Sequence, residues 1–214
     1  MFVYFPSCNF SRLRPDTSQA VKEFLSGQGV RIEGCCRPGH KQLTKQDTAI
    51  TICQTCAIIL REQCPQTAQI SLWEYLDSLP GLSLPDHTGE TIVLQDCWRA
   101  RKNPELHRAV RSLLEKMHYR IVELPQNREK AVFDGTWLYQ PVAPRNRQIA
   151  PRAFRLIEPY IREASPQKQQ RLMEEYASSL PGKAVCYCNS CLSGLLDGGA
   201  SAFHLAELIF EGKS

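Results

Sequence analysis

The first 56 residues of this chain contain five cysteines at spacings that suit a metal site. They are Cys8, the adjacent pair Cys35-Cys36, and Cys53-x2-Cys56, which together give the pattern C-x26-C-C-x16-C-x2-C. Thiolates are preferred ligands of zinc and of iron–sulfur clusters. Structural zinc takes four ligands in a tetrahedron and has no place for a fifth, whereas a cluster distributes thiolates over several irons. The pattern therefore favours an iron–sulfur cluster, with zinc or a dithiol redox centre as the alternatives.

A second group of cysteines lies in the C-terminal half, at Cys97, Cys186, Cys188 and Cys191. Four thiols are enough to hold a zinc ion or a simpler iron–sulfur cluster. They are also typical of a metal-free protein interior, because a free cysteine packs as a small hydrophobic residue. The residues alone leave both interpretations open.

The composition excludes several classes of function. The 214 residues are 43% hydrophobic and 22% charged, and they carry a net charge of +4. That charge is too weak, without a long Lys/Arg run, to indicate nucleic-acid binding. No apolar run approaches the ~20 residues of a membrane span, and the N-terminus does not have the pattern of a signal peptide. We therefore expect a cytoplasmic protein with no direct membrane span, whose thiols stay reduced and available to metals.

Short strands and helices that alternate along the chain must position the cysteines. We expect strands at 1–5, 30–33, 48–52 and 69–71, with helices that begin near residues 15, 56 and 72. Ser71 and Glu74 have the spacing of a capping box at the start of the last helix. This alternation predicts a parallel sheet, and ligands of such sheets bind at the carboxyl ends of the strands. Each cysteine of the first group follows a strand or begins a helix, so we expect all five at one edge.

The C-terminal half repeats this order, which indicates a tandem duplication. Four segments match in the same order: 96–101, which follows a strand at 91–94, with 8–12; 119–123 with 29–33; 184–191 with 49–56; and 204–209 with 71–76. We predict an α/β fold of two repeats that form small, mostly parallel sheets. The N-terminal module spans 1–80 and has the complete cysteine set, and the C-terminal module spans 90–214.

The second module differs from the first in two ways. Phe133-Asp134-Gly135 stands near the place where the adjacent cysteine pair is expected. An insertion at about 140–182 precedes Cys188, and its prolines predict helices at 151–164 and 166–180. We expect this helical hairpin to pack on the outside of the second module.

These motifs resemble the cysteine-rich CCG family. That family includes the B subunit of heterodisulfide reductase, the C subunit of anaerobic glycerol-3-phosphate dehydrogenase, and iron–sulfur subunits of glycolate and lactate oxidases. Its module has a single Cys, then Cys-Cys-Gly, then Cys-x2-Cys, and is usually present twice. The resemblance covers nearly the whole chain and implies an iron–sulfur oxidoreductase subunit. Such a subunit passes electrons from a flavoprotein or iron–sulfur donor subunit to a disulfide, a quinone or a similar acceptor.

The resemblance also implies a ligand set. A complete module of the heterodisulfide reductases holds a non-cubane [4Fe-4S] cluster, which would be bound here by Cys8, Cys35, Cys36, Cys53 and Cys56. The chain departs from the family at Arg37, which replaces the glycine after the pair, and at Phe133-Asp134. The second module is therefore expected to be degenerate, with zinc, a different cluster or no metal on Cys97, Cys186, Cys188 and Cys191.

Two hypotheses compete with that of an electron-transfer protein. One is a zinc-stabilised scaffold or assembly protein, and the other is a metal-free dithiol oxidoreductase that uses Cys53 and Cys56. The sequence has no flavin or nicotinamide fingerprint. An electron-transfer function therefore requires electrons from another subunit.

Overall fold

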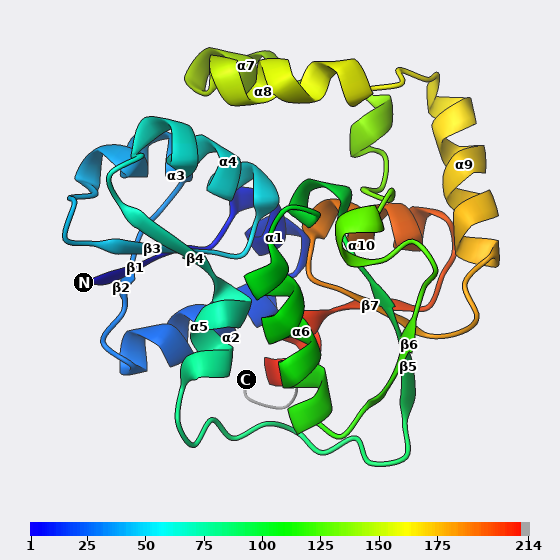
Figure 1. Ribbon diagram of the computed structural model, residues 1–214, viewed down its shortest axis with the longest axis horizontal. Helices are drawn as coiled ribbons and strands as arrows, with labels where there is room; N and C mark the ends of the chain where they lie inside the picture. Colours follow the sequence, from blue (N-terminus) through cyan, green and yellow to red (C-terminus); the bar gives the residue numbers. More distant parts are fainter. Residues whose placement is uncertain (211–214) are drawn as a thin grey trace.

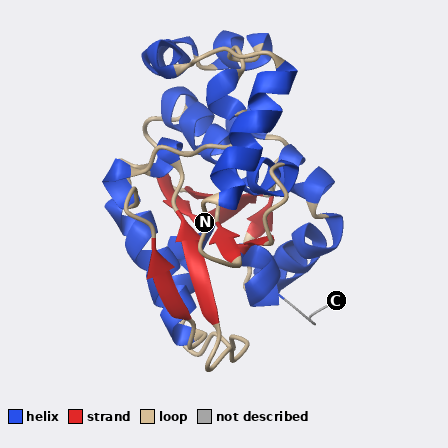
Figure 2. Cartoon of the chain, turned by 90° about the vertical axis from the view of Figure 1, so that its right-hand side faces the viewer, coloured by secondary structure: helices blue, strands red, loops and turns tan. Residues whose placement is uncertain are grey.

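The computed structural model describes residues 1–210, which form two α/β modules, each on a four-stranded, all-parallel sheet (Figures 1 and 2). The strands are β1 (Phe2–Phe5), β2 (Arg31–Ile32), β3 (Thr48–Thr51), β4 (Ala68–Ser71), β5 (Thr91–Gln95), β6 (Arg120–Glu123), β7 (Ala184–Cys186) and β8 (Ala202–His204). The first sheet has the order β2-β1-β3-β4 and the second has the order β6-β5-β7-β8. The two sheets thus share one topology, which confirms the predicted α/β fold of two repeats.

Eleven α-helices are present in residues 1–210. They are α1 (Cys8–Leu13), α2 (Pro15–Gly27), α3 (Cys36–Gly39), α4 (Gln54–Gln63), α5 (Leu72–Ser78), α6 (Pro104–Lys116), α7 (Pro144–Ile149), α8 (Pro151–Ile157), α9 (Pro166–Ser178), α10 (Asn189–Asp197) and α11 (Leu205–Phe210). Several begin where the sequence predicts. At α5, for example, Ser71 Oγ accepts from Glu74 N (3.1 Å) and the Glu74 carboxylate accepts from Ser71 N (2.8 Å). None of the helices in this described part is long and apolar enough to cross a membrane.

The two modules share one layer of helices. The helices α2 and α5 of the first module pack against α11 and α6 of the second, in crossed pairs that reflect the duplication. Figure 1 shows α5 and α6 side by side between the two sheets. An Arg14–Glu207 ion pair (2.6 Å) links α11 to the residue that precedes α2. The main hydrophobic core therefore continues from one module into the other.

The insertion spans both modules, so the prediction that it packs only on the second is wrong. Its last helix, α9, lies against α10 of the second module, whereas α7 and α8 lie over α4 of the first (Figure 1). The apolar side of α8 buries Phe154 in a separate core cluster that contains Cys36, Cys53 and Cys56. The insertion thereby covers the first cysteine site.

His204 is buried where the modules meet, and it predicts a pH effect on stability. Its ring lies 4.7 Å from that of Phe10 and 5.6 Å from that of Trp73, its Nδ1 accepts from Ala206 N, and its Nε2 has no partner within residues 1–210. Burial lowers the pKa of His204 to about 3. Below the unfolded pKa of 6.5, the unfolded chain takes up a proton that the folded chain does not. Stability is therefore full above pH 6.5 and falls by up to about 1.4 kcal/mol per pH unit below it.

Urea unfolding at pH 7, 6 and 5 measures this slope. His204→Asn keeps a side-chain acceptor for Ala206 N but does not titrate in this range, so its unfolding free energy should fall less steeply. Identical slopes for the two proteins would show that His204 is not the titrating group.

Candidate metal centres

The carboxyl ends of the strands position the site cysteines, as the sequence predicts. Cys8 begins α1 just after β1, and Cys35 is the N-cap residue of α3. Cys53 and Cys188 are the N-cap residues of α4 and α10, at equivalent places in the two modules. Backbone N–H groups at the start of a helix favour the thiolate over the thiol. The fold therefore places ionisable sulfur at matched positions in both repeats.

The five thiols of the first module lie together in one continuous chain of contacts. Cys8 interacts with Cys35, Cys35 with Cys36, Cys36 with Cys56, and Cys56 with Cys53. Cys36, Cys53 and Cys56 are buried, whereas Cys8 is exposed. Within residues 1–210, one group of possible metal ligands has all its ligand atoms within 4.8 Å of one another, and that group lies in the second module. The five thiols of the first module do not form such a group. The first site is thus extended and reaches the surface at Cys8.

Hydrogen bonds among Cys36, Cys53 and Cys56 shift the pKa values of these three thiols in opposite directions. A bond from Cys56 lowers the pKa of Cys53 to about 6, although burial opposes this. A hydrogen bond from Cys56 also lowers the pKa of Cys36. Because Cys56 donates to both Cys36 and Cys53, its own pKa is raised. A metal must displace the protons that remain, so its affinity for this site should increase with pH.

The second module forms a compact four-ligand site from Cys97, Asp134, Cys188 and Cys191. One ligand atom from each residue lies within 4.8 Å of all the others, and all four residues are buried. Asp134 Oδ1 is 3.5 Å from Cys97 Sγ and 3.7 Å from Cys188 Sγ. A tetrahedral zinc ion with Zn–S bonds of about 2.3 Å requires sulfurs roughly 3.8 Å apart. This site can therefore hold a metal ion, and the spacing of its ligand atoms suits tetrahedral coordination.

Asp134, and not Cys186, supplies the fourth ligand atom of this compact site. Cys186 is the last residue of β7, and its thiol is 3.7 Å from the carbonyl oxygens of Cys188 and Phe203. Asp134 lies in the Phe133-Asp134-Gly135 segment, near the position of the cysteine pair in the first module. The residue that breaks the expected motif thus contributes an oxygen to the same edge of the sheet.

Gly135 fixes the segment that presents Asp134. It has a φ of +55°, and a Cβ at this position would lie 2.0 Å from the carbonyl oxygen of Ser190 on α10. Ser190 Oγ also donates to the carbonyl oxygen of Asp134 (2.7 Å). The segment can approach α10 this closely only because residue 135 has no side chain.

Gly135→Ala is therefore expected to destabilise the protein by at least about 2 kcal/mol, from the clash and the left-handed backbone together. Gly199→Ala is the matched control, because Gly199 also has a positive φ (+82°) but has no atom within 4 Å of the added Cβ. The control should cost only about 1 kcal/mol. Urea denaturation measures both free energies, and equal losses would argue against a packing role for Gly135.

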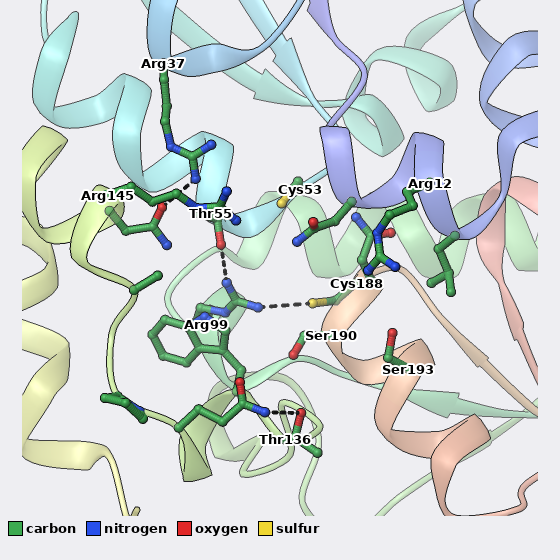
Figure 3. A pocket seen from close by; sticks show the side chains of 18 residues that line it. Arg12, Arg37, Cys53, Thr55, Arg99, Thr136, Arg145, Cys188, Ser190 and Ser193 are labelled. Carbon is green, nitrogen blue, oxygen red and sulfur yellow. Dashed lines mark hydrogen bonds between the residues drawn. The ribbon is translucent and has the colours of Figure 1, made fainter.

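Arg99 connects the two sites. Its side chain is 3% exposed and pairs with both oxygens of Asp134, with Nε 2.6 Å from Oδ2 and Nη2 3.0 Å from Oδ1. Nη2 also lies 3.7 Å from Cys188 Sγ, and Nη1 donates to Thr55 Oγ1 (2.6 Å) between Cys53 and Cys56 (Figure 3). Its charge lowers the pKa of both Cys53 and Cys188, after the larger effect of hydrogen bonds from neighbouring thiols. No pattern in the sequence indicates this role for Arg99.

Arg99 acts on the second site through the ligand that it orients. The bond from Nε to Oδ2 holds the Asp134 carboxylate so that Oδ1 faces the thiols of Cys97 and Cys188. Its positive charge also offsets part of the negative charge of three thiolates and a carboxylate. The chain matches no protein-family model, no curated protein and no solved structure. The description of both sites therefore rests on their donor atoms and contacts alone.

Proposed function

We propose that this protein is an iron–sulfur electron-transfer protein or redox-complex subunit. In this proposal the first module holds a [4Fe-4S] cluster, of cubane or non-cubane type, on Cys8, Cys35, Cys36, Cys53 and Cys56. The observation that carries the proposal is the continuous chain of five thiols that do not converge on one point. Such a donor set suits several irons better than one ion.

The cluster would supply one-electron transfer, and the surrounding residues would control access to it. Arg37 Nη1 lies 3.8 Å from Cys35 Sγ and so places positive charge beside a ligand. The insertion covers the buried cysteines, while Cys8 remains exposed. Cys8 therefore marks the side at which a donor subunit, flavoprotein or iron–sulfur protein, would approach. The acceptor would be a disulfide, a quinone or a similar compound.

We propose a structural role for a metal in the second module. Four converging ligands would complete a tetrahedron around one ion and would leave no open position for a substrate. We propose that zinc occupies this site and stabilises the module. The same observation favours the second candidate function, a zinc-stabilised scaffold, if the first module binds no iron.

A third candidate is a metal-free dithiol oxidoreductase. The pKa of about 6 at Cys53, which a hydrogen bond from Cys56 produces, is in the range of reactive thiols. This hypothesis predicts a Cys53–Cys56 disulfide that forms and reduces without metal. The exposed Cys8 and the pair Cys35-Cys36 have no function in it.

Anaerobic purification followed by metal and sulfide analysis separates these functions. The proposal predicts about four irons with matching acid-labile sulfide, roughly one zinc, and a paramagnetic signal that changes on reduction. A colourless protein with zinc alone would support the scaffold. A metal-free protein that cycles between dithiol and disulfide would support the oxidoreductase.

A further inference from the structure

A cavity of about 330 Å³ lies between the two modules and the insertion, beside both metal centres (Figure 3). The sulfur-bearing residues Cys53 and Cys188, one from each centre, are part of its lining. Helices α1, α3, α4, α7 and α10 all contribute residues to it. Its volume is at the lower end of the range for small-molecule sites. It therefore suits a ligand of small size.

The lining of this cavity is strongly cationic. It contains Arg12, Arg37, Arg99 and Arg145, and it contains no aspartate, glutamate or lysine. Figure 3 shows Arg37 and Arg145 toward the upper left of the cavity and Arg12 toward the upper right. Guanidinium groups match the planar, two-oxygen geometry of carboxylate and phosphate groups. Four of them around one cavity are typical of a site for such groups.

Part of this positive charge has no partner within the protein. Arg99 is neutralised by Asp134 from outside the lining, and Arg37 donates to the side-chain oxygen of Asn146 (2.7 Å). In residues 1–210, however, the side chains of Arg12 and Arg145 form no hydrogen bond or ion pair, and the buried Nε of Arg37 also has no acceptor. An anion from solution can pair with these groups.

We propose that this cavity binds a small molecule with two or more negative charges, through Arg12, Arg37 and Arg145. The shared chemistry is a pair of carboxylate or phosphate-type groups, spaced to meet arginines on opposite sides of the cavity. If the protein transfers electrons, as proposed above, this molecule is the acceptor or is attached to it. The anion site itself depends only on the lining residues and is independent of the metal content.

Isothermal titration calorimetry with simple probes tests this proposal. The protein is titrated with succinate, inorganic phosphate, acetate and succinamide, the last being the neutral counterpart of succinate. We expect succinate or phosphate to bind at least 10-fold more tightly than acetate, and succinamide not to bind. The tighter of the two dianions then identifies the carboxylate or the phosphate class. Binding of succinamide as tight as that of succinate would overturn the proposal.

Variants locate the site. Arg145→Gln and Arg12→Gln each remove an exposed, unpaired guanidinium and should weaken dianion binding roughly 10- to 100-fold. Arg145→Lys should restore part of the affinity, because the charge remains but the two-pronged geometry is lost. Arg155→Gln is the matched control, since Arg155 is exposed on α8 outside the cavity lining, and it should bind like the wild type. An equal loss in Arg155→Gln and Arg145→Gln would indicate general charge attraction and overturn the assignment.

Iron analysis of the same samples keeps this test separate from that of the proposed function. Dianion binding in a protein without iron would support the anion site and contradict the electron-transfer function. An iron-loaded protein that binds no dianion would support the electron-transfer function and contradict the anion site.

Discussion

If the second module binds zinc, as proposed, replacing Cys188 with alanine is expected to weaken that binding by at least about 100-fold. A substitution in the outer shell of a metal site already costs 10- to 100-fold in affinity, and Cys188 is in direct reach of the ion. Hydrogen bonds from Cys191 and Cys97 also lower the pKa of Cys188 well below its usual range, which favours the thiolate form that binds metal. Its loss removes one corner of the tetrahedron and the strongest negative charge. Titration with Co²⁺, whose absorption reports tetrahedral thiolate ligation, followed by competition with Zn²⁺, measures the change.

The matched control for this variant is Cys186→Ala. Cys186 is only two residues away and equally buried, but its thiol contacts backbone carbonyls and is not among the four converging ligands. Its zinc affinity should stay within about 2-fold of that of the wild type. Both variants should carry Cys36→Ser and Cys56→Ser, so that the first site does not bind the titrant. Equal losses would place Cys186, and not Asp134, in the ligand set.

If the first module holds the proposed iron–sulfur cluster, replacing Cys36 with serine is expected to remove its iron almost completely. Cys36 occupies the middle of the chain of thiols, where it interacts with Cys35 on one side and Cys56 on the other. A serine there leaves two separated pairs of thiols, Cys8/Cys35 and Cys53/Cys56. We expect the iron content to fall from about four per chain to the background level. Iron and sulfide assays on anaerobically purified protein measure this.

Two further variants show whether this loss is specific. Cys64 is also buried, but its thiol donates to the carbonyl oxygen of His40 (3.3 Å) outside the chain of thiols, so Cys64→Ser should retain the iron. Cys188→Ser should also leave the first centre loaded, because the two sites use different ligands. A comparable loss of iron in Cys36→Ser and Cys188→Ser would instead indicate one site shared by both modules.

Local sequence patterns were sufficient for the architecture. Apolar and β-branched runs predicted the strands, and caps such as Ser71 with Glu74 predicted where helices begin. Matched segments in the two halves predicted two similar sheets, and both have the same all-parallel order. The parallel order, in turn, brings the cysteines that follow the strands to one edge in each module. These features depend on near neighbours in the chain, so the sequence contains the information directly.

The position of Cys186 shows where spacing alone is misleading. A strand rises about 3.3 Å per residue, so residues two positions apart in an extended chain lie roughly 6.6 Å apart along it. Cys186 is the last residue of β7, whereas Cys188 lies two residues beyond the strand and caps α10. Thiols so close in sequence therefore face different surroundings. Only the end of the strand, which the structure defines, separates the ligand from the core residue.

Asp134, Arg99 and the insertion depend on contacts between remote segments. Asp134 reaches its site because Gly135 allows close approach to α10, some 55 residues later in the chain. The helices α7 and α8 cross to the first module because Phe154 buries its ring in that core. Neither contact leaves a periodic pattern in the sequence.

The sequence by itself determined the two repeated sheets and the five-cysteine group of the first module, because strand order and local spacing bring these residues together. The tertiary structure alone decided that an aspartate joins the four-ligand group of the second module, that Arg99 connects this group with the thiols of the first module, and that four arginines surround one cavity. These groups come from segments that are far apart in the chain. Their convergence depends on how the modules and the insertion pack, which no local pattern encodes.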